Sequence, residues 1–279
     1  VTPLGFTKAG KKLAKLIAKQ GQNMSIDRLL WAGNGDFVTA TLSVDAQSYS
    51  YHIFDLNLGT DTKISDFYFK TKHTDALVPT ETVQITARDG MKLNALLLRP
   101  KGVDGAAPMV LEVHGGPAGQ VKWEYHHFRQ FLVNRGYAVL AVNFRGSSGL
   151  GKIYQAAGYG EYGRKMQDDL VDATLWAIDQ GIADPKAIAI NGSSYGGYAS
   201  AMGLVRDPDL FKAGIIEHAM LDVAYQSQYP PHSWGLYLGQ WERYFGDINS
   251  PGDMEKMHQR SPINLVAQMQ AAALMVAGK

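Results

Sequence analysis

The sequence has no cysteine among its 279 residues. This absence excludes disulfide bonds, thiolate metal sites and a cysteine nucleophile, but it leaves the choice between cytoplasm and periplasm open. Positive and negative charges are also nearly balanced, with a formal net charge of +1. Nothing in that balance favours binding to nucleic acid or to an anionic membrane surface.

Long apolar runs are also absent. No segment approaches the length that a transmembrane helix needs, and no signal peptide is visible. The chain begins with Val-Thr-Pro instead of Met, so an upstream targeting segment stays compatible with it. The only cationic cluster, the lysines between Lys8 and Lys19, fits a solvated loop or helix face better than a binding patch. None of the eight histidines shows metal-ligand spacing with carboxylates, so we expect no metal and no cofactor.

What is present indicates a folded globular protein. Hydrophobic residues make up 46% and charged residues 19% of a chain long enough for one large domain, or for one domain with part of another. Residues 1–79 predict short β-strands at 36–42 and 49–56. Such strands suit a sandwich, a propeller blade or a small β appendage.

The pattern changes from residue 81 onward. Two β-prone runs, 81–88 and 91–98, flank Asp89-Gly90, which is a strong signal for a two-residue hairpin. Beyond them a helical pattern, clearest over 166–178, alternates with strand-like runs at 110–113, 138–142, 187–190, 213–216 and 273–276. The alternation predicts an α/β fold with a mostly parallel sheet covered on both faces, and ligand sites at the carboxyl ends of its strands.

The run Gly192-Ser193-Ser194-Tyr195-Gly196 lies between the predicted strand 187–190 and a predicted helix over 198–205. A Gly-x-Ser-x-Gly sequence in this context lifts a serine onto a tight elbow, where it can act as a nucleophile. Glycine suits both ends of the turn, because a side chain there would crowd the backbone. We therefore take Ser194 as the candidate nucleophile, with a plain Gly/Ser loop as the alternative.

A serine nucleophile needs donors for the oxyanion that forms when it attacks a carbonyl. On such an elbow one donor is the backbone N–H of the next residue, here Tyr195, and the other comes from a glycine-rich loop after an earlier strand. The run His114-Gly115-Gly116-Pro117 follows the predicted strand 110–113, which makes Gly116 the candidate second donor. An ordinary turn is the alternative interpretation of this run.

Two further segments are candidates for the surroundings of the site. The loop 143–151 follows a predicted strand and lacks the Lys-Ser/Thr ending of a P-loop, so it favours a role at the rim of an active site. The aromatic stretch between Tyr225 and Tyr244 either walls a substrate pocket, which would suit an apolar side chain beside the cleaved bond, or packs within a helical cap. Asp168, Asp169 and Asp172 are expected at a helix start, where carboxylates favour the helix dipole.

At these residues the chain resembles the prolyl oligopeptidase family of serine peptidases, most closely its acylaminoacyl-peptidase and dipeptidyl-peptidase branches. The resemblance rests on the 114–117 loop, the Asn-Phe-Arg-Gly-Ser-Ser-Gly run 143–149, the segment 160–170 and the Ser194 elbow. It implies hydrolysis of short peptides through an acyl-enzyme. It also implies that residues 1–79 are the last part of a β-propeller and that residues 80–279 belong to an α/β-hydrolase domain.

The chain departs from the family at its end. In α/β-hydrolases the nucleophile is followed by an Asp or Glu and then a His. The resemblance places that acid just past the strand 273–276 and the histidine further on, so both are expected beyond Lys279 and the chain by itself is expected to be inactive. His218 is a weak substitute for the base, because its place is not that of the family's histidine. Asp222 is expected at the rim of the site or as a helix cap.

We therefore interpret the chain as part of a serine peptidase acting on oligopeptides, with Ser194 as nucleophile and Gly116 and Tyr195 as oxyanion donors. A carboxylesterase or other acyl hydrolase of the same fold, and a non-catalytic binding module, are the alternatives. The residue preferred at the cleaved bond, exo- against endopeptidase action and the oligomeric state are not determined by the sequence.

Overall fold

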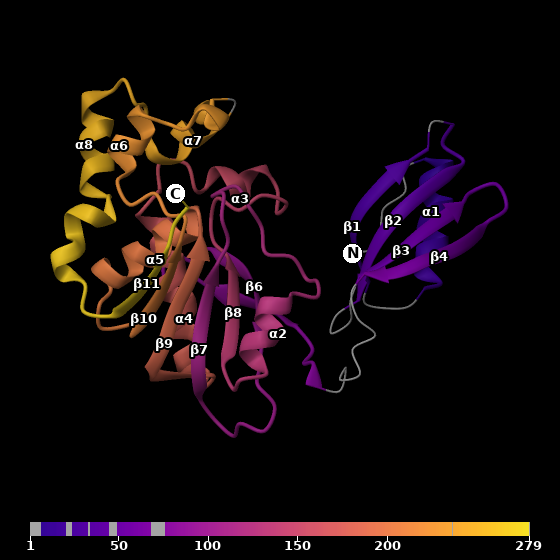
Figure 1. Cartoon of the computed structure of the whole chain (residues 1–279), viewed down its shortest axis with the longest axis horizontal. Helices are drawn as coiled ribbons and strands as arrows, with labels where there is room; N and C mark the ends of the chain where they lie inside the picture. Colours follow the sequence, from indigo (N-terminus) through magenta and orange to yellow (C-terminus); the bar gives the residue numbers. More distant parts are fainter. Residues whose placement is uncertain are drawn as a thin grey trace. The chain divides into compact units, whose positions relative to one another are not determined.

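The computed structural model describes residues 7–20, 24–32, 34–44, 49–67, 76–235 and 237–278. Contacts between residues divide the chain into two compact units. The first comprises Val1–Thr80 and Trp123–Asn134, and the second comprises Glu81–Lys122 and Arg135–Lys279. Figure 1 labels their helices and strands along the chain.

The first unit holds a four-stranded antiparallel sheet in the order β1-β2-β3-β4. Its elements are α1 (Lys8–Ala18), β1 (Met24–Trp31), β2 (Phe37–Val44), β3 (Tyr49–Asp55), β4 (Thr60–Phe67) and α2 (His127–Val133). The strands predicted at 36–42 and 49–56 are confirmed as β2 and β3. Within this unit the Gln130 side chain on α2 accepts the Val78 N–H at 3.1 Å and donates to the Val78 carbonyl at 2.9 Å.

Helix α1 covers one face of this sheet. Thr7 caps its first turn by accepting the Gly10 N–H at 3.0 Å. Leu13, Leu16 and Ile17 follow helical spacing and are buried in one cluster with apolar residues of β2 and β3. The lysines from Lys8 to Lys19 are exposed, so the prediction of a solvated helix face is confirmed.

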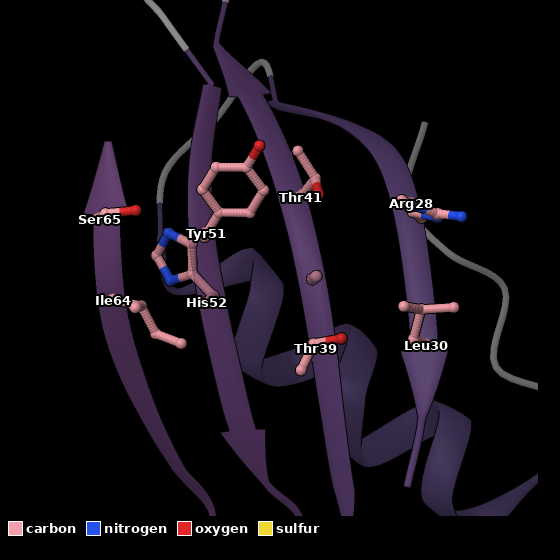
Figure 2. A pocket seen from close by; sticks show the side chains of 9 residues that line it. Arg28, Leu30, Thr39, Thr41, Tyr51, His52, Ile64 and Ser65 are labelled. Atoms are coloured by element: carbon pink, nitrogen blue, oxygen red, sulfur yellow. The ribbon is translucent and has the colours of Figure 1, made fainter. Parts of the chain in front are cut away.

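A shallow pocket lies on this sheet, and Figure 2 shows the side chains that line it. Thr39 and Thr41 of β2 and Tyr51 of β3 stand on successive odd positions, so their side chains share one face of the sheet. The even positions of the same strands, such as Val38 and Phe54, are buried toward α1.

The second unit is built on a seven-stranded sheet in the order β11-β10-β9-β7-β8-β6-β5. The strands from β7 to β11 are parallel: β7 pairs with β8 and β9, β9 with β10, and β10 with β11. β5 and β6 form an antiparallel hairpin at one edge, and β6 is antiparallel to β8. The bounds are β5 (Glu81–Thr86), β6 (Lys92–Leu98), β7 (Ala107–Val113), β8 (Ala138–Asn143), β9 (Ala183–Ser193), β10 (Ala213–Glu217) and β11 (Ala272–Val276). The predicted mostly parallel sheet and the hairpin around Asp89-Gly90 are confirmed.

Helices α4 and α5 both contact β9 and lie side by side, because the Gln167 side chain of α4 donates to the Ala199 carbonyl of α5 at 3.1 Å. The described residues of this unit form six α-helices. They are α3 (Lys152–Ala156), α4 (Lys165–Asp179), α5 (Tyr195–Arg206), α6 (Val223–Gln228), α7 (Leu238–Phe245) and α8 (Pro251–Gln259), with short 3₁₀ turns at His232–Trp234 and Pro262–Gln268. Leu111, Leu140 and Ile190 are fully buried in this unit. Each such side chain contributes about 1.5–3 kcal/mol relative to an exposed one. No helix in the described part of the chain combines the length and the apolar character that crossing a bilayer requires.

Helix α5 begins earlier than its predicted start at residue 198. Gly196 and Gly197, which the sequence pattern assigned to the turn, lie in its first helical turn. A Cβ atom on either glycine would collide with backbone oxygens, that of Val113 at Gly196 and that of Glu217 at Gly197. Glycine is therefore needed there because the helix packs directly on the ends of β7 and β10, and not because the chain turns.

Candidate active site

Ser194 lies at the carboxyl end of β9, at the point where α5 begins. Its backbone has φ 58° and ψ −117°, a conformation that costs a residue with a side chain about 1–3 kcal/mol. Two hydrogen bonds hold this geometry: the Ser194 N–H donates to the Glu217 carbonyl at 2.9 Å, and the Ser194 carbonyl accepts the Tyr198 N–H at 3.0 Å. The Ser194 residue is exposed, so its hydroxyl group can be reached from solvent.

The loop 114–117 lies directly against this elbow. A Cβ atom on Gly115 would stand 3.1 Å from the Ser193 carbonyl oxygen and 3.5 Å from the Ser194 Cβ, so the loop and the elbow are in close contact. Gly116 has φ 132°, which favours glycine. Gly116, Pro117, Ser194 and Tyr195 line one pocket. No residue in the described part of the chain accepts the backbone N–H of Gly116 or that of Tyr195.

His114 fixes the orientation of this loop. Its Nδ1 lies 2.8 Å from the Gly115 carbonyl oxygen, and its Nε2 lies 2.8 Å from the Ser147 hydroxyl. The ring also stacks on Phe144, with a centroid distance of 4.3 Å. The Ser147 hydroxyl itself donates to the Phe144 carbonyl at 2.7 Å, so both ring nitrogens of His114 face oxygen atoms that can accept a proton. Because a peptide unit is planar, holding the Gly115 carbonyl also fixes the direction of the Gly116 N–H.

The loop 143–151 carries a buried ion cluster. The Arg145 guanidinium donates to Asp169 at 2.6 and 2.9 Å, and the Arg145 backbone N–H donates to the same carboxylate at 2.8 Å. Its other side donates to Asp89 at 2.7 and 3.0 Å. Hydrogen bonds from Arg145 hold the pKa of the Asp89 carboxyl well below its usual range. The cluster ties the β5–β6 turn and α4 to the segment that carries Phe144 and Ser147.

These contacts refine two interpretations drawn from the sequence. The first part of the loop, Asn143 to Ser147, is buried and contacts the 114–117 loop through Phe144 and Ser147, whereas Gly149 and Gly151 are exposed. Asp169 is fully buried as a partner of Arg145, so helix-dipole stabilisation does not account for its position. Asp172 instead accepts the Arg88 N–H at 2.7 Å, outside this cluster.

Aromatic side chains form the wall of the Ser194 pocket. Trp234 and Trp241 meet edge to face at 4.4 Å between ring centroids, and they line the pocket with Met220, Tyr162 and Phe245. Burial raises the pKa of the Tyr162 phenol well above its usual value, so the wall carries no charge at neutral pH. The two interpretations of the aromatic stretch apply to different residues. Trp234 and Trp241 line the pocket. Tyr244 instead packs in the interior, where it is fully buried and its hydroxyl donates to the Gly146 carbonyl at 2.9 Å.

Among the described residues, no base contacts the Ser194 hydroxyl. His218, with φ 47°, follows β10; its backbone N–H donates to Val276 at 2.8 Å and its residue is exposed. Asp222 accepts the Tyr225 N–H at 3.0 Å at the start of α6, which confirms it as a helix cap. Within residues 76–235 and 237–278 no histidine or carboxylate hydrogen-bonds the Ser194 hydroxyl. The described residues also contain no group of three side chains suited to hold a metal ion.

A Ser–His–Asp arrangement occurs instead in the four-stranded sheet. His52 Nδ1 lies 2.9 Å from an Asp61 carboxylate oxygen, and its Nε2 lies 3.0 Å from the Ser50 hydroxyl. Because His52 bonds both a carboxylate and a hydroxyl, the hydrogen bonds alone would suggest Ser50 as the nucleophile of a catalytic triad. Ser50 and His52 are only 8% and 4% exposed, however, so a substrate carbonyl cannot reach the hydroxyl. We interpret this cluster as a structural link between β3 and β4.

Comparison with known proteins agrees with this geometry. Residues 123–279 match the prolyl oligopeptidase family. Dipeptidyl aminopeptidase BIII of Pseudoxanthomonas mexicana is 36% identical over 274 residues, which cover 91% of this chain and 39% of that protein.

Solved structures extend the likeness to the fold. A puromycin hydrolase matches with a TM-score of 0.80 at 21% identity, over 88% of this chain and 37% of its own. The acylaminoacyl peptidase of Pyrococcus horikoshii matches with a TM-score of 0.77 at 21% identity, over 92% and 40%. The chain thus spans less than half the length of these proteins. The family match covers more than half of the chain, which therefore belongs to the prolyl oligopeptidase family and carries its α/β-hydrolase fold.

Proposed function

We propose that the protein containing this chain is a serine peptidase that hydrolyses short peptides through an acyl-enzyme on Ser194. The Ser194 hydroxyl attacks the carbonyl carbon of the scissile bond while a general base takes its proton. The C–N bond then breaks, the amine leaves with that proton, and water releases the acid by the same route. The supporting observation is an exposed serine on a strand–helix elbow, in one pocket with two N–H groups that no described residue accepts.

In this proposal the Gly116 and Tyr195 N–H groups stabilise the oxyanion of the tetrahedral intermediate. Tyr195 is the first residue of α5, where a helix leaves its N–H without an intrahelical partner. Such preorganised donors act most strongly where charge develops in the transition state, and the loss of one lowers kcat by about 10²- to 10³-fold.

We further propose that the general base and its acidic partner are a histidine and an aspartate outside residues 1–279. Two observations support this: no described histidine or carboxylate bonds the Ser194 hydroxyl, and the relatives are more than twice as long as the chain. Purified residues 1–279 should then show little turnover. In the same way we propose residues 1–79 as the last part of a β-propeller and residues 80–279 as the hydrolase domain, in keeping with the four antiparallel strands of β1–β4.

The walls of the Ser194 pocket predict the substrate side chain. Trp234, Trp241 and Met220 offer apolar surface, and none of the described residues that line the pocket is charged. Substrates with Phe or Leu on the acyl side of the scissile bond should show a kcat/KM at least about 100-fold above those with Asp or Lys, since an unpaired charge in an apolar pocket is costly. A matched series of fluorogenic peptides measures this. Equal rates for Leu and Asp would contradict an apolar specificity pocket.

His114→Ala tests the support of the oxyanion loop. Without the imidazole, the Gly115–Gly116 peptide can rotate and turn the Gly116 N–H away from the intermediate. We expect kcat to fall by about 10²-fold or more with little change in KM, because the lost interaction acts in the transition state. His258→Ala is the control, because His258 is an exposed histidine whose ring makes no hydrogen bond within the described residues. If KM alone rises, His114 contributes to substrate binding and not to the oxyanion site.

Covalent labelling tests the proposed function as a whole. A fluorophosphonate probe should modify the full-length protein at one residue, and peptide mass spectrometry should place the adduct on Ser194. The Ser194→Ala variant should not be labelled. Hydrolysis of peptidyl amides separates a peptidase from an esterase of the same fold, which would cleave only the matching esters. A full-length protein that neither reacts with the probe nor cleaves either substrate would overturn the enzymatic proposal.

A further inference from the structure

A second depression lies on the opposite side of α7 from the Ser194 pocket. It is lined by Lys152 and Gln155 of α3, Tyr159, and Gln240 and Arg243 of α7. Two residues of α7, Trp241 and Phe245, line the Ser194 pocket. They are four positions apart and therefore share one side of the helix. Gln240 and Arg243 lie on another side, so one helix separates the two pockets.

This depression is cationic. Lys152 and Arg243 line it, and no carboxylate does. Arg88, Arg145 and Arg206 of the same unit each pair with an aspartate. In the described part of the chain, by contrast, neither Lys152 nor Arg243 has a carboxylate within ion-pair distance. Two neighbouring cations without a counter-charge repel each other, and an anion between them would remove that repulsion.

The Arg243 guanidinium is already oriented. It lies 5.8 Å from the centroid of the Tyr159 ring, and Tyr159 meets Tyr244 edge to face at 5.1 Å. The fully buried Tyr244 is in turn bonded to the Gly146 carbonyl. Stacking on an aromatic face leaves the N–H donors at the guanidinium edge free for a ligand. The side-chain amide of Gln240 adds a neutral donor on the same walls.

We propose that this depression is an oxyanion-binding site, which takes a carboxylate or a phosphate group between Lys152 and Arg243. A planar guanidinium fork matches two oxygens of such a group, and the lysine supplies a point charge opposite it. The same chemistry is offered by free inorganic phosphate and by the C-terminal carboxylate of a short peptide. This inference goes beyond the proposed peptidase activity, because binding at this place requires no reaction at Ser194.

Isothermal titration at low salt tests the site, with inorganic phosphate, a short peptide with a free C-terminus, and the same peptide amidated. We expect saturable binding with a Kd of about 1 mM for at least one of the first two, and none for the amidated peptide. Arg243→Gln and Lys152→Gln should each weaken binding at least about tenfold, and Arg243→Lys by less, because it keeps the charge and loses the fork. Lys186→Gln, an exposed lysine away from the depression, should leave binding unchanged.

The outcomes separate this inference from the proposed function. Binding that Arg243→Gln and Lys152→Gln weaken and that Ser194→Ala leaves unchanged places the anion in this depression and not in the catalytic pocket. The titrations with phosphate and with the free peptide show whether the bound oxyanion is a phosphate or a peptide carboxylate. Equal circular dichroism and melting temperature of the variants exclude misfolding as the cause of a loss. Absence of saturable binding of either anion, or binding that Lys186→Gln weakens as much as Arg243→Gln does, overturns the site.

Discussion

Ser194→Ala in the full-length protein should lower kcat/KM for peptide hydrolysis by about 10⁴- to 10⁶-fold. The reason is that the proposed acyl-enzyme forms on this hydroxyl, and neither the loop nor the oxyanion donors can replace a missing nucleophile. The remaining rate should come from the Gly116 and Tyr195 donors and from substrate binding alone. Steady-state kinetics on a fluorogenic peptide that carries Phe or Leu beside the scissile bond measures the loss.

The neighbouring serine supplies the matched control. Ser193 is the last residue of β9, and its hydroxyl makes no hydrogen bond within the described residues. Ser193→Ala should therefore keep most of the activity. Loss of activity in Ser193→Ala together with its retention in Ser194→Ala would show that the nucleophile has been assigned to the wrong serine.

Asp169→Ala should lower the free energy of unfolding by about 3–5 kcal/mol, because it leaves a buried guanidinium with part of its partners missing. Asp169 is fully buried, and the Arg145 side chain is 5% exposed. A stability of about 5–15 kcal/mol is usual for a domain, so the change removes a large share of it. Urea denaturation followed by circular dichroism measures the loss.

Two variants show whether the charge itself causes that loss. Asp179→Ala, an exposed aspartate on the same helix, should change stability by less than about 0.5 kcal/mol. Arg145→Met combined with Asp169→Leu should be more stable than Asp169→Ala alone, since apolar side chains can replace a buried ion pair. If the double variant is the less stable of the two, the hydrogen bonds of the pair matter more than its unpaired charge.

The site residues that could be located from the sequence lie in short, continuous motifs. Ser194, Gly116 and Tyr195 are recognised from short motifs that follow strands, and in the structure Ser194, Gly116 and Tyr195 lie around one pocket. Their catalytic roles remain predictions. The parallel sheet was predicted for the same reason, because each strand and each helix leaves its own periodic pattern.

The supporting contacts could not be predicted, because they join residues distant in sequence. Arg145 meets Asp169 and Asp89 across 24 and 56 positions, and His114 meets Ser147 across 33. The residue types gave a partial signal: an arginine inside a glycine-rich loop needs a carboxylate if the loop is buried. The strands β1 and β4 were also missed, since their many charged and exposed residues leave only a weak alternating pattern.

The backbone of Ser194 has a consequence for how the protein can evolve. A left-handed φ of 58° is easier for glycine than for any residue with a side chain. Selection for thermostability alone would thus favour losing the hydroxyl at this position, whereas selection for peptide turnover retains it. A lineage that abandoned hydrolysis and kept the fold would be expected to drift first at residue 194.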